Sequence, residues 1–160
     1  MKNILLVTVT LFILGCSGGG EKKAKSSEPN KTKKVESNEV KLVLNSNDQM
    51  LFDKSVLKAK ASEEVSLLLN HTGKIGKEFM GHNFVLLKNN VDVDDFAQAA
   101  MLAKENDYIP DGDDTIAYTS MIGGGESDQI SFTVNEPGTY VFLCTFPGHY
   151  QIMRGEFIIE

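Results

Sequence analysis

Cysteine, basic charge and long apolar runs are all scarce in this sequence of 160 residues. The two cysteines are Cys16 and Cys144, so at most one disulfide could form within the chain. Lys and Arg number 16 against 22 Asp and Glu, which argues against nucleic acid as a partner, because proteins that bind it present a clustered basic face. After the first fifteen residues, no stretch is apolar enough to predict a transmembrane helix.

The first fifteen residues have the form of a secretory signal peptide. Lys2 precedes the apolar stretch 4–14, which is too short to span a membrane. Gly15 directly before Cys16 resembles a bacterial lipobox, which implies cleavage before Cys16 and acylation of its thiol. The alternatives are an ordinary secretory peptide with an incidental cysteine, or a short membrane-tail anchor. Acylation of Cys16 would leave Cys144 without a disulfide partner, so this exported thiol needs another explanation.

Two further segments follow the expected signal peptide. Residues 16–39 contain six Lys, four Glu and almost no large apolar side chain, so they cannot bury enough surface to offset the entropy of ordering. We expect a flexible linker there. Residues 40–160 contain nine Lys and Arg and eighteen Asp and Glu, and we expect them to form a single acidic domain.

Short runs of alternating or continuous apolar character recur in the domain and indicate β-strands. Turn residues such as Glu136-Pro137-Gly138 separate them. Seven or eight strands predict a β-sandwich. The expected strands cover residues 41–44, 55–59, 65–69, 83–87, 116–119, 129–134, 139–143 and 155–159.

One stretch of the domain has a different pattern. Residues 94–103 begin with acidic side chains, consist of strong helix formers, and place apolar residues at helical spacing. A polar loop with one proline and one glycine follows at residues 106–114. We therefore expect one short helical insertion on the sandwich.

Soft metal ligands are concentrated in ten residues after an expected strand, where Cys144, His149 and Met153 offer a thiol, an imidazole and a thioether. Thiolate, imidazole and a weak thioether suit copper that cycles between two oxidation states. His82, at the start of another expected strand, is the natural fourth ligand, and His71 is its rival. Zinc is the alternative metal, but structural zinc sites favour four Cys or His ligands without a thioether.

Each of these residues has an ordinary structural interpretation when taken alone. Cys144 could be a buried structural cysteine, His82 and His149 could be surface or core histidines, and Met153 could be a core methionine. Their joint spacing is what favours ligation.

The motifs around these residues point to one family. The spacing Cys144-x4-His149-x3-Met153 begins Cys-Thr-Phe-Pro-Gly-His, and a second motif reads Met80-Gly81-His82-Asn83. Both closely resemble the azurins, which are blue-copper proteins among the cupredoxins, and the loop spacing separates azurins from plastocyanins. The resemblance covers roughly residues 40–160, and it also includes Asn47-Asp48-Gln49-Met50, His71-Thr72-Gly73 and Ile122-Gly123-Gly124-Gly125-Glu126.

The resemblance implies an all-β Greek-key sandwich of the cupredoxin type that binds one copper ion and transfers single electrons. Cys144, His82 and His149 would form the trigonal plane. Met153 would lie distant on one axis, and the carbonyl of Gly81 would lie distant on the other. A scaffold that holds this geometry keeps reorganisation small when the copper changes oxidation state.

Several neighbours of the ligands have roles implied by the same resemblance. In azurins, backbone amides at the positions of Asn83 and Phe146 donate to the thiolate and tune the potential. A non-ligating histidine at the position of His71 can couple protonation to that potential. His149 should lie nearest the surface, within an apolar ring that we expect to dock partners. The ring comprises Met50, Met80, Phe146, Pro147 and Ile152.

The sequence departs from the azurin pattern at several positions. Azurins usually carry a disulfide whose positions fall near Val40 and Ser62, and neither residue is cysteine here. Phe84 occupies the place of a tryptophan that many azurins have in the core, and the chain contains no tryptophan. Tyr150 and Gln151 make the edge of the docking ring bulkier and more polar, which bears on the choice of partner. Because the disulfide is absent, the stability of the fold must rest on packing and copper.

We interpret the chain as a lipid-anchored blue-copper electron carrier of the bacterial cell envelope, monomeric or weakly self-associating. Its expected partners are redox proteins such as c-type cytochromes or copper or haem reductases. The alternative is a module that stores or delivers copper without redox turnover. An enzyme is disfavoured, because a copper oxidase or reductase needs an open coordination position or a second copper centre, and the sequence holds no further His and Cys cluster.

Overall fold

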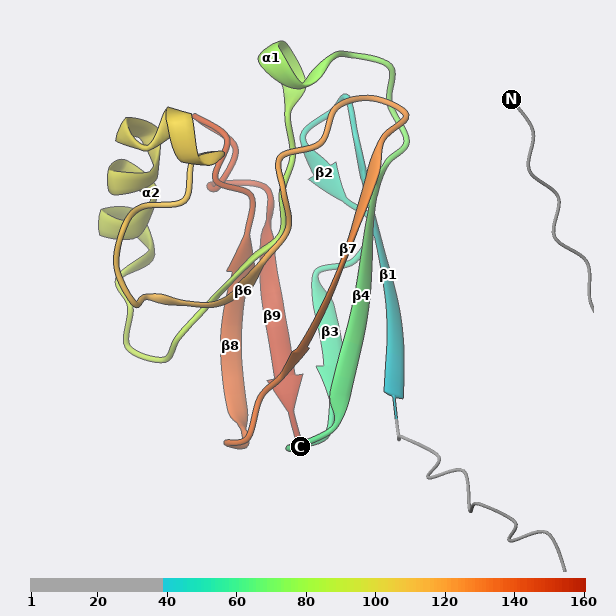
Figure 1. Cartoon of the computed structure of the whole chain (residues 1–160), viewed down its shortest axis with the longest axis vertical. Coiled ribbons are helices and arrows are strands. Elements are labelled where there is room, and N and C mark those ends of the chain that lie inside the picture. Colours follow the sequence, from blue (N-terminus) through green and yellow to red (C-terminus); the bar gives the residue numbers. More distant parts are fainter. Residues whose placement is uncertain (1–38) are drawn as a thin grey trace, which may run out of the picture. The chain divides into compact units, whose positions relative to one another are not determined.

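The computed structural model describes residues 39–160, which form two β-sheets packed face to face (Figure 1). The expected signal peptide 1–15, the acylation expected at Cys16 and the expected linker up to residue 38 lie outside the described residues. In the first sheet, β1 and β4 are parallel, whereas the other pairs are antiparallel. The order of the first sheet is β2 (Leu51–Phe52), β1 (Glu39–Asn47), β4 (Glu64–His71) and β7 (Ser127–Thr133).

The second sheet contains five strands, of which β3 and β9 are parallel and the others antiparallel. Successive strands of the chain alternate between the sheets at several points, so their pairings are mostly between segments far apart in sequence. The order is β3 (Val56–Ala59), β9 (Arg154–Ile159), β8 (Gly138–Leu143), β5 (Val85–Leu87) and β6 (Thr115–Tyr118).

The main core lies between the sheets and is built from the inward-facing residues of the alternating strands. Three phenylalanines occupy it without any exposed surface: Phe84, Phe142 and Phe157. The rings of Phe84 and Phe142 lie 5.4 Å apart, so aromatic packing fills the centre where the chain has no tryptophan. Leucine and valine side chains from both sheets complete this cluster.

The expected helical insertion is present as α2 (Val93–Leu102), between β5 and β6. The carboxylate of Asp92 caps it by accepting from the backbone N–H groups of Asp94 and Asp95, at 3.0 and 2.9 Å. Phe96 packs with Val85 in a second apolar cluster, which places α2 against the outer face of the second sheet (Figure 1). This packing explains why β5 is buried throughout rather than alternating.

All eight expected strands are present, and the structure adds three short elements that the sequence pattern did not indicate. These are β2, the single-turn helix α1 (Lys77–Met80) and the 3₁₀ turn η1 (Lys104–Asn106). Elements of two to four residues are too short to show a period, and tertiary contacts stabilise them. In residues 39–160, no helix is long and apolar enough to cross a membrane.

Two boundaries differ from the expectation in a way that matters for function. β1 begins at Glu39, the last residue assigned to the linker. The expected strand 83–87 begins as β5 at Val85, because the preceding segment pairs elsewhere: His82 forms an isolated bridge with Ile122. His82 is therefore held by the loop that precedes β7.

Candidate metal centre

Three buried ligand atoms converge at one end of the sandwich. Cys144 follows β8, and its Sγ lies 3.8 Å from Nδ1 of His82 and 3.7 Å from Nδ1 of His149. The three ligand atoms all lie within 4.8 Å of one another. We call this end, which carries His82, Cys144, His149 and Met153, the metal pole. Figure 1 shows the loop between β8 and β9 and helix α1 at this end, away from the C-terminus.

The loop between β8 and β9 closes on itself through backbone hydrogen bonds. At its base, the amide of Cys144 donates to the carbonyl of Met153 over 2.9 Å. At its tip, the amide of His149 donates to the carbonyl of Phe146 over 3.0 Å, and Gly148 adopts a φ of 84° that suits glycine. The loop therefore brings Cys144 and His149 together through local structure, and the side chain of Met153, whose backbone bonds to Cys144, is fully buried.

The second strand end presents His82 in a fixed orientation. Its Nε2 donates to the carbonyl of Asn47 over 2.9 Å, which leaves the lone pair of Nδ1 directed toward Cys144. Its backbone N–H and C=O both bond to Ile122 at 2.9 Å. The ring thus has one tautomer and one direction before any ion arrives. The resemblance motif contained Asn47, but nothing in the sequence indicated that its carbonyl would orient a ligand.

His71 lies beside this site without facing it. Its Nε2 donates to the carbonyl of Met80 over 2.9 Å, and its Nδ1 accepts from the amide of Gly73 over 3.0 Å. Its ring stacks on that of His82 with centroids 4.5 Å apart. Because both ring nitrogens are engaged, His71 has no free lone pair for a metal. His71 is therefore a packed neighbour of the site and not a candidate ligand.

Asn83 ties the two ligand-bearing segments together. Its Oδ1 accepts from the amide of Thr145 over 2.9 Å, and its Nδ2 donates to the hydroxyl of Thr145 over 2.7 Å. Both residues are buried, so these bonds are shielded from competing water. The backbone amides of Asn83 and Phe146 also hydrogen-bond to the sulfur of Cys144. The role of Thr145 was not predicted from the sequence, where this residue appeared only within the motif Cys-Thr-Phe-Pro-Gly-His.

Burial shifts the ionisation of the three ligands toward their neutral forms. It raises the pKa of the Cys144 thiol to about 12, an effect that hydrogen bonds from the amides of Asn83 and Phe146 oppose. Burial also lowers the pKa of His82 and of His149 to about 4. At neutral pH the imidazoles are thus neutral with available lone pairs, and a metal must displace the proton of the thiol.

The donor set fits copper. It combines one thiol, two imidazoles whose Nδ1 atoms face it, and a buried methionine at the base of the same loop. The carbonyl of Gly81 lies 3.9 Å from the sulfur. A Cβ at Gly81 would lie 2.6 Å from the carbonyl oxygen of Lys77, so only glycine fits at this position without displacing that backbone.

The five residues of the expected docking ring differ in exposure. Pro147 is exposed and Ile152 is 53% exposed, whereas Met50, Met80 and Phe146 are half-buried. The ring of Phe146 lies 4.7 Å from that of His149, so the docking ring contacts a ligand directly. Sequence reasoning missed one apolar side chain of α1 at this end, Phe79, which is 80% exposed.

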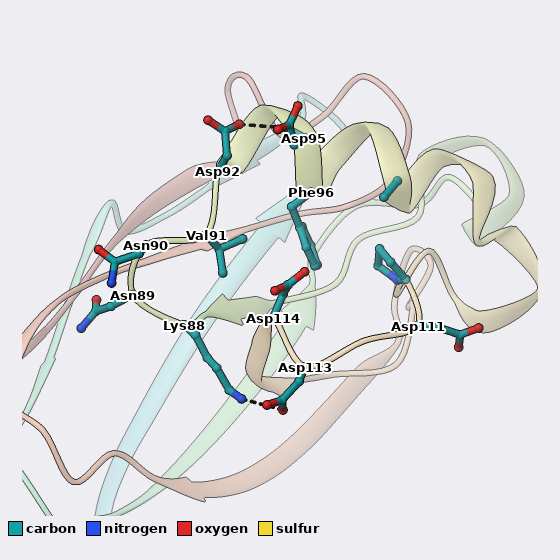
Figure 2. A pocket seen from close by; sticks show the side chains of 12 residues that line it. Lys88, Asn89, Asn90, Val91, Asp92, Asp95, Phe96, Asp111, Asp113 and Asp114 are labelled. Atoms are coloured by element: carbon teal, nitrogen blue, oxygen red, sulfur yellow. Dashed lines mark hydrogen bonds and ion pairs between the residues drawn. The ribbon is translucent and has the colours of Figure 1, made fainter.

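A separate hollow lies between the N-terminal end of α2 and the loop that leads to β6 (Figure 2). Its volume is about 490 Å³, and five aspartates line it: Asp92, Asp95, Asp111, Asp113 and Asp114. Lys88 forms an ion pair with one of them, Asp113. None of the metal-pole residues lines this hollow, so it is not part of the metal centre.

The fold and the site together define the class. A two-sheet cupredoxin-like sandwich with a buried His, Cys and His cluster and a methionine on the same loop is a blue copper protein. Its copper site is of type 1 and comprises His82, Cys144, His149 and Met153, one ion per domain.

Comparisons with known proteins identify the family. Residues 38–160 match the family of copper binding proteins described as plastocyanin/azurin. Azurin of Alcaligenes faecalis is 42% identical over 114 residues, which cover 68% of this chain and 89% of that protein. The chain belongs to the plastocyanin/azurin family. Members of this kind are electron carriers rather than enzymes, and their partners are redox proteins.

Solved structures agree with this assignment. Auracyanin A of Chloroflexus aurantiacus, described as a "blue" copper protein, has a TM-score of 0.70 and 27% identity, and the match covers 76% of this chain and 99% of that one. An azurin of Methylomonas sp. strain J has a TM-score of 0.68 and 32% identity, with 76% and 98% coverage. The sandwich with a short helical insertion, expected from the sequence, is confirmed.

Proposed function

We propose that this protein carries single electrons between redox proteins of the bacterial cell envelope. In this proposal His82, Cys144 and His149 would hold the copper ion, and Met153 and the carbonyl of Gly81 would contribute weaker contacts. The observation that carries it is the convergence of three buried, neutral ligand atoms within 4.8 Å of one another. When bound, copper supplies a one-electron couple between Cu(II) and Cu(I).

The surrounding residues prepare the site before the metal binds. The carbonyl of Asn47 fixes the ring of His82, and the side chain of Asn83 joins the two ligand segments through Thr145. The closed loop after Cys144 fixes its own ligands. A site held in this way changes little in shape with oxidation state, so each transfer requires little reorganisation. Burial of the ligands excludes water from the metal.

His149 is the proposed point of exchange with partners. It lies in the loop tip against Phe146, and Pro147 and Ile152 expose apolar surface beside it. An apolar surface of this kind suits short-lived contacts with redox proteins such as c-type cytochromes or copper or haem reductases. Such partners approach closely without strong charge pairing.

We propose further that Cys16 anchors the chain to a membrane of the cell envelope through acyl chains, and that residues up to 38 act as a tether. Support comes from the sequence, where a signal-peptide pattern ends at Gly15 and Cys16. The mass of the mature N-terminal peptide tests this directly. Acyl chains on Cys16 are expected, and an unmodified cysteine or cleavage elsewhere would contradict the anchor.

Visible and EPR spectra of the copper-loaded chain test the electron-carrier function, with Cys144→Ser as the matched control. We expect an intense blue band and narrow copper hyperfine splitting that the control lacks, because both arise from the thiolate. A pale spectrum typical of ordinary Cu(II) complexes would reject the proposal and favour copper delivery or zinc binding. Exchange of electrons with a c-type cytochrome, faster than release of copper to a chelator, would separate carrier from delivery protein.

A further inference from the structure

We propose that Asp107 is a positioning residue for the metal pole and that, with Tyr108, it braces the ligand-bearing segments from outside. Neither residue belongs to the ligand set or to the docking ring. The inference rests on the proposed ligation by His82, Cys144 and His149. It assigns a purpose to the end of the helical insertion, which the electron-transfer chemistry does not otherwise use.

The backbone at this point is unusual. Asp107 and Tyr108 follow η1 and have φ values of 49° and 61°, so two successive residues other than glycine occupy the left-handed region. This conformation costs free energy for side chains with a Cβ, and it persists where surrounding contacts hold it. Local bonds contribute, since the amide of Tyr108 donates to the carbonyl of Ala103 over 3.0 Å. The other contacts lead to the metal pole.

The first of these contacts runs through the carboxylate of Asp107. Its Oδ2 accepts from the amide of Met121 over 3.2 Å. Met121 directly precedes Ile122, whose backbone bonds to His82 in both directions at 2.9 Å. A carboxylate that accepts from a backbone amide makes a stronger bond than a neutral acceptor does. Asp107 therefore fixes the segment that holds His82 from the other side.

The second contact runs through the backbone carbonyl of Asp107. It accepts from Nδ2 of Asn83 over 3.3 Å, and the same nitrogen donates to the hydroxyl of Thr145 over 2.7 Å. Asn83 follows His82, and Thr145 follows Cys144. The left-handed conformation of Asp107 thus places its carbonyl where it satisfies the amide group that joins both segments.

The third contact runs through the ring of Tyr108. It packs edge-on against the ring of Phe146 with centroids 5.5 Å apart, and Phe146 in turn lies 4.7 Å from the ring of His149. The backbone amide of Phe146 hydrogen-bonds to the sulfur of Cys144. The position of Phe146 therefore influences two ligands, and Tyr108 limits that position from the side of the helical insertion.

These contacts reach the neighbours of three ligands from one two-residue turn. A rigid site needs supporting residues that lock the ligands from more than one direction. The turn at Asp107 and Tyr108 adds support from the end of the helical insertion. Loss of its carboxylate frees the Met121 amide and relaxes the segment holding His82, even though no ligand is altered.

Four variants of the full chain test this inference. Asp107→Gly removes the carboxylate while glycine accepts the left-handed backbone, so any effect is separate from added strain. Asp107→Asn keeps an oxygen acceptor and a residue that tolerates this backbone. Tyr108→Phe keeps the ring that packs on Phe146. Asp111→Gly removes one charge from an exposed position of the same insertion and serves as the matched control.

Two readouts are measured. In the copper-free chain, hydrogen exchange of the Met121 amide is expected to accelerate about tenfold in Asp107→Gly, which corresponds to one charge-assisted hydrogen bond. In the copper-loaded chain, the same variant is expected to shift the blue band, the hyperfine splitting and the reduction potential. Asp107→Asn is expected to shift them less, and Tyr108→Phe and Asp111→Gly should leave the spectra unchanged.

The two readouts separate this inference from the proposed function. Unchanged Met121 exchange in Asp107→Gly, or spectra shifted equally in Asp107→Gly and Asp111→Gly, would overturn the positioning role. If the unaltered chain itself shows no blue colour, the proposed function fails, and amide exchange in the copper-free chain still decides whether Asp107 braces this segment.

Discussion

The interior of the sandwich and the metal pole are equally buried but are held together differently. Between the sheets the contacts are apolar, as in the packing of Phe142 against Phe52 and Phe84 with centroids 5.7 and 5.4 Å apart. At the metal pole, several of the residues buried to a similar degree are polar, among them His82, Asn83 and Thr145. In residues 39–160, every buried side-chain nitrogen and oxygen has a hydrogen-bond partner.

This difference predicts how each region responds to substitution. Apolar contacts are not directional, so the interior tolerates exchanges that conserve volume and loses stability mainly through cavities. Hydrogen bonds are directional and costly to leave unmade, so the metal pole depends on individual atoms. Apolar packing in the interior stabilises the fold, whereas burial of polar ligands at the metal pole lowers the free energy of unfolding.

The largest effect on stability is expected from a cavity in the interior. Phe142→Ala removes a side chain without exposed surface that packs against two other rings, and it should lower the free energy of unfolding by about 3–5 kcal/mol. Chemical denaturation of the copper-free protein measures this. Phe142→Leu is the control that retains most of the volume. Equal losses in both variants would show that the cavity is not the cause.

The next largest effect compares matched substitutions in the two regions. Asn83→Leu keeps the size but strands the amide of Thr145 without its partner, and it should cost about 2–3 kcal/mol. Leu86→Met in the interior, also without exposed surface, should cost less than about 1.5 kcal/mol. Denaturation measures both, and copper titration should show weaker binding in Asn83→Leu alone. The reverse order of costs would refute the distinction between the regions.

The pH dependence of stability in the copper-free protein is expected to come from the metal pole. His82 and His149 have a pKa of about 4 when folded against 6.5 ordinarily. Between these values the unfolded chain binds more protons, so stability falls as the pH falls from about 6.5 to about 4. The thiol of Cys144 has a pKa of about 12 against 9.0, so stability also falls as the pH rises above 9.0.

Denaturation across the pH range should therefore show a plateau between these two limbs. Cys144→Ala should remove the alkaline limb and leave the acid limb in place, because it deletes the thiol without touching either imidazole. Survival of the full alkaline limb in that variant would show that another group causes it. Bound copper should remove the alkaline limb, since the ligated sulfur retains no proton, whereas the acid limb should remain, because the two imidazoles still take up protons when the chain unfolds.

The smallest effect on stability is expected at the surface of the metal pole. Ile152→Ser at a position 53% exposed should change stability by less than about 0.5 kcal/mol and leave the blue spectrum unaltered. Electron exchange with a c-type cytochrome should slow, since loss of one apolar contact is worth about 1 kcal/mol of binding. Leu102→Ser on α2, 91% exposed and outside the docking ring, is the control. Equal slowing in both variants would remove Ile152 from the docking surface.

Local patterns in the sequence determined much of the fold and three of the four ligands of the metal centre. The eight expected strands and α2 follow from apolar periodicity and an acidic helix start, which are properties of neighbouring residues. The loop that carries Cys144, His149 and Met153 is also local, because ten consecutive residues contain the ligands, the Pro147-Gly148 turn and the hydrogen bonds that close it. Such features need no knowledge of distant parts of the chain.

Tertiary structure alone decided how these parts meet. The parallel pairing of β1 with β4 joins segments that have no local signal for one another, and the carbonyl of Asn47, 35 residues before His82 in the chain, meets the ring of that histidine. Hydrogen bonds to the carbonyl of Met80 and from the amide of Gly73 engage both nitrogens of His71 and so remove it as a ligand, although its residue type is identical to that of His82. The brace at Asp107 likewise depends on contacts with Asn83 and Met121. The sequence determines which residues are histidines. The direction of an imidazole lone pair depends on the hydrogen-bond partners of the ring, and only the folded chain places those partners beside it.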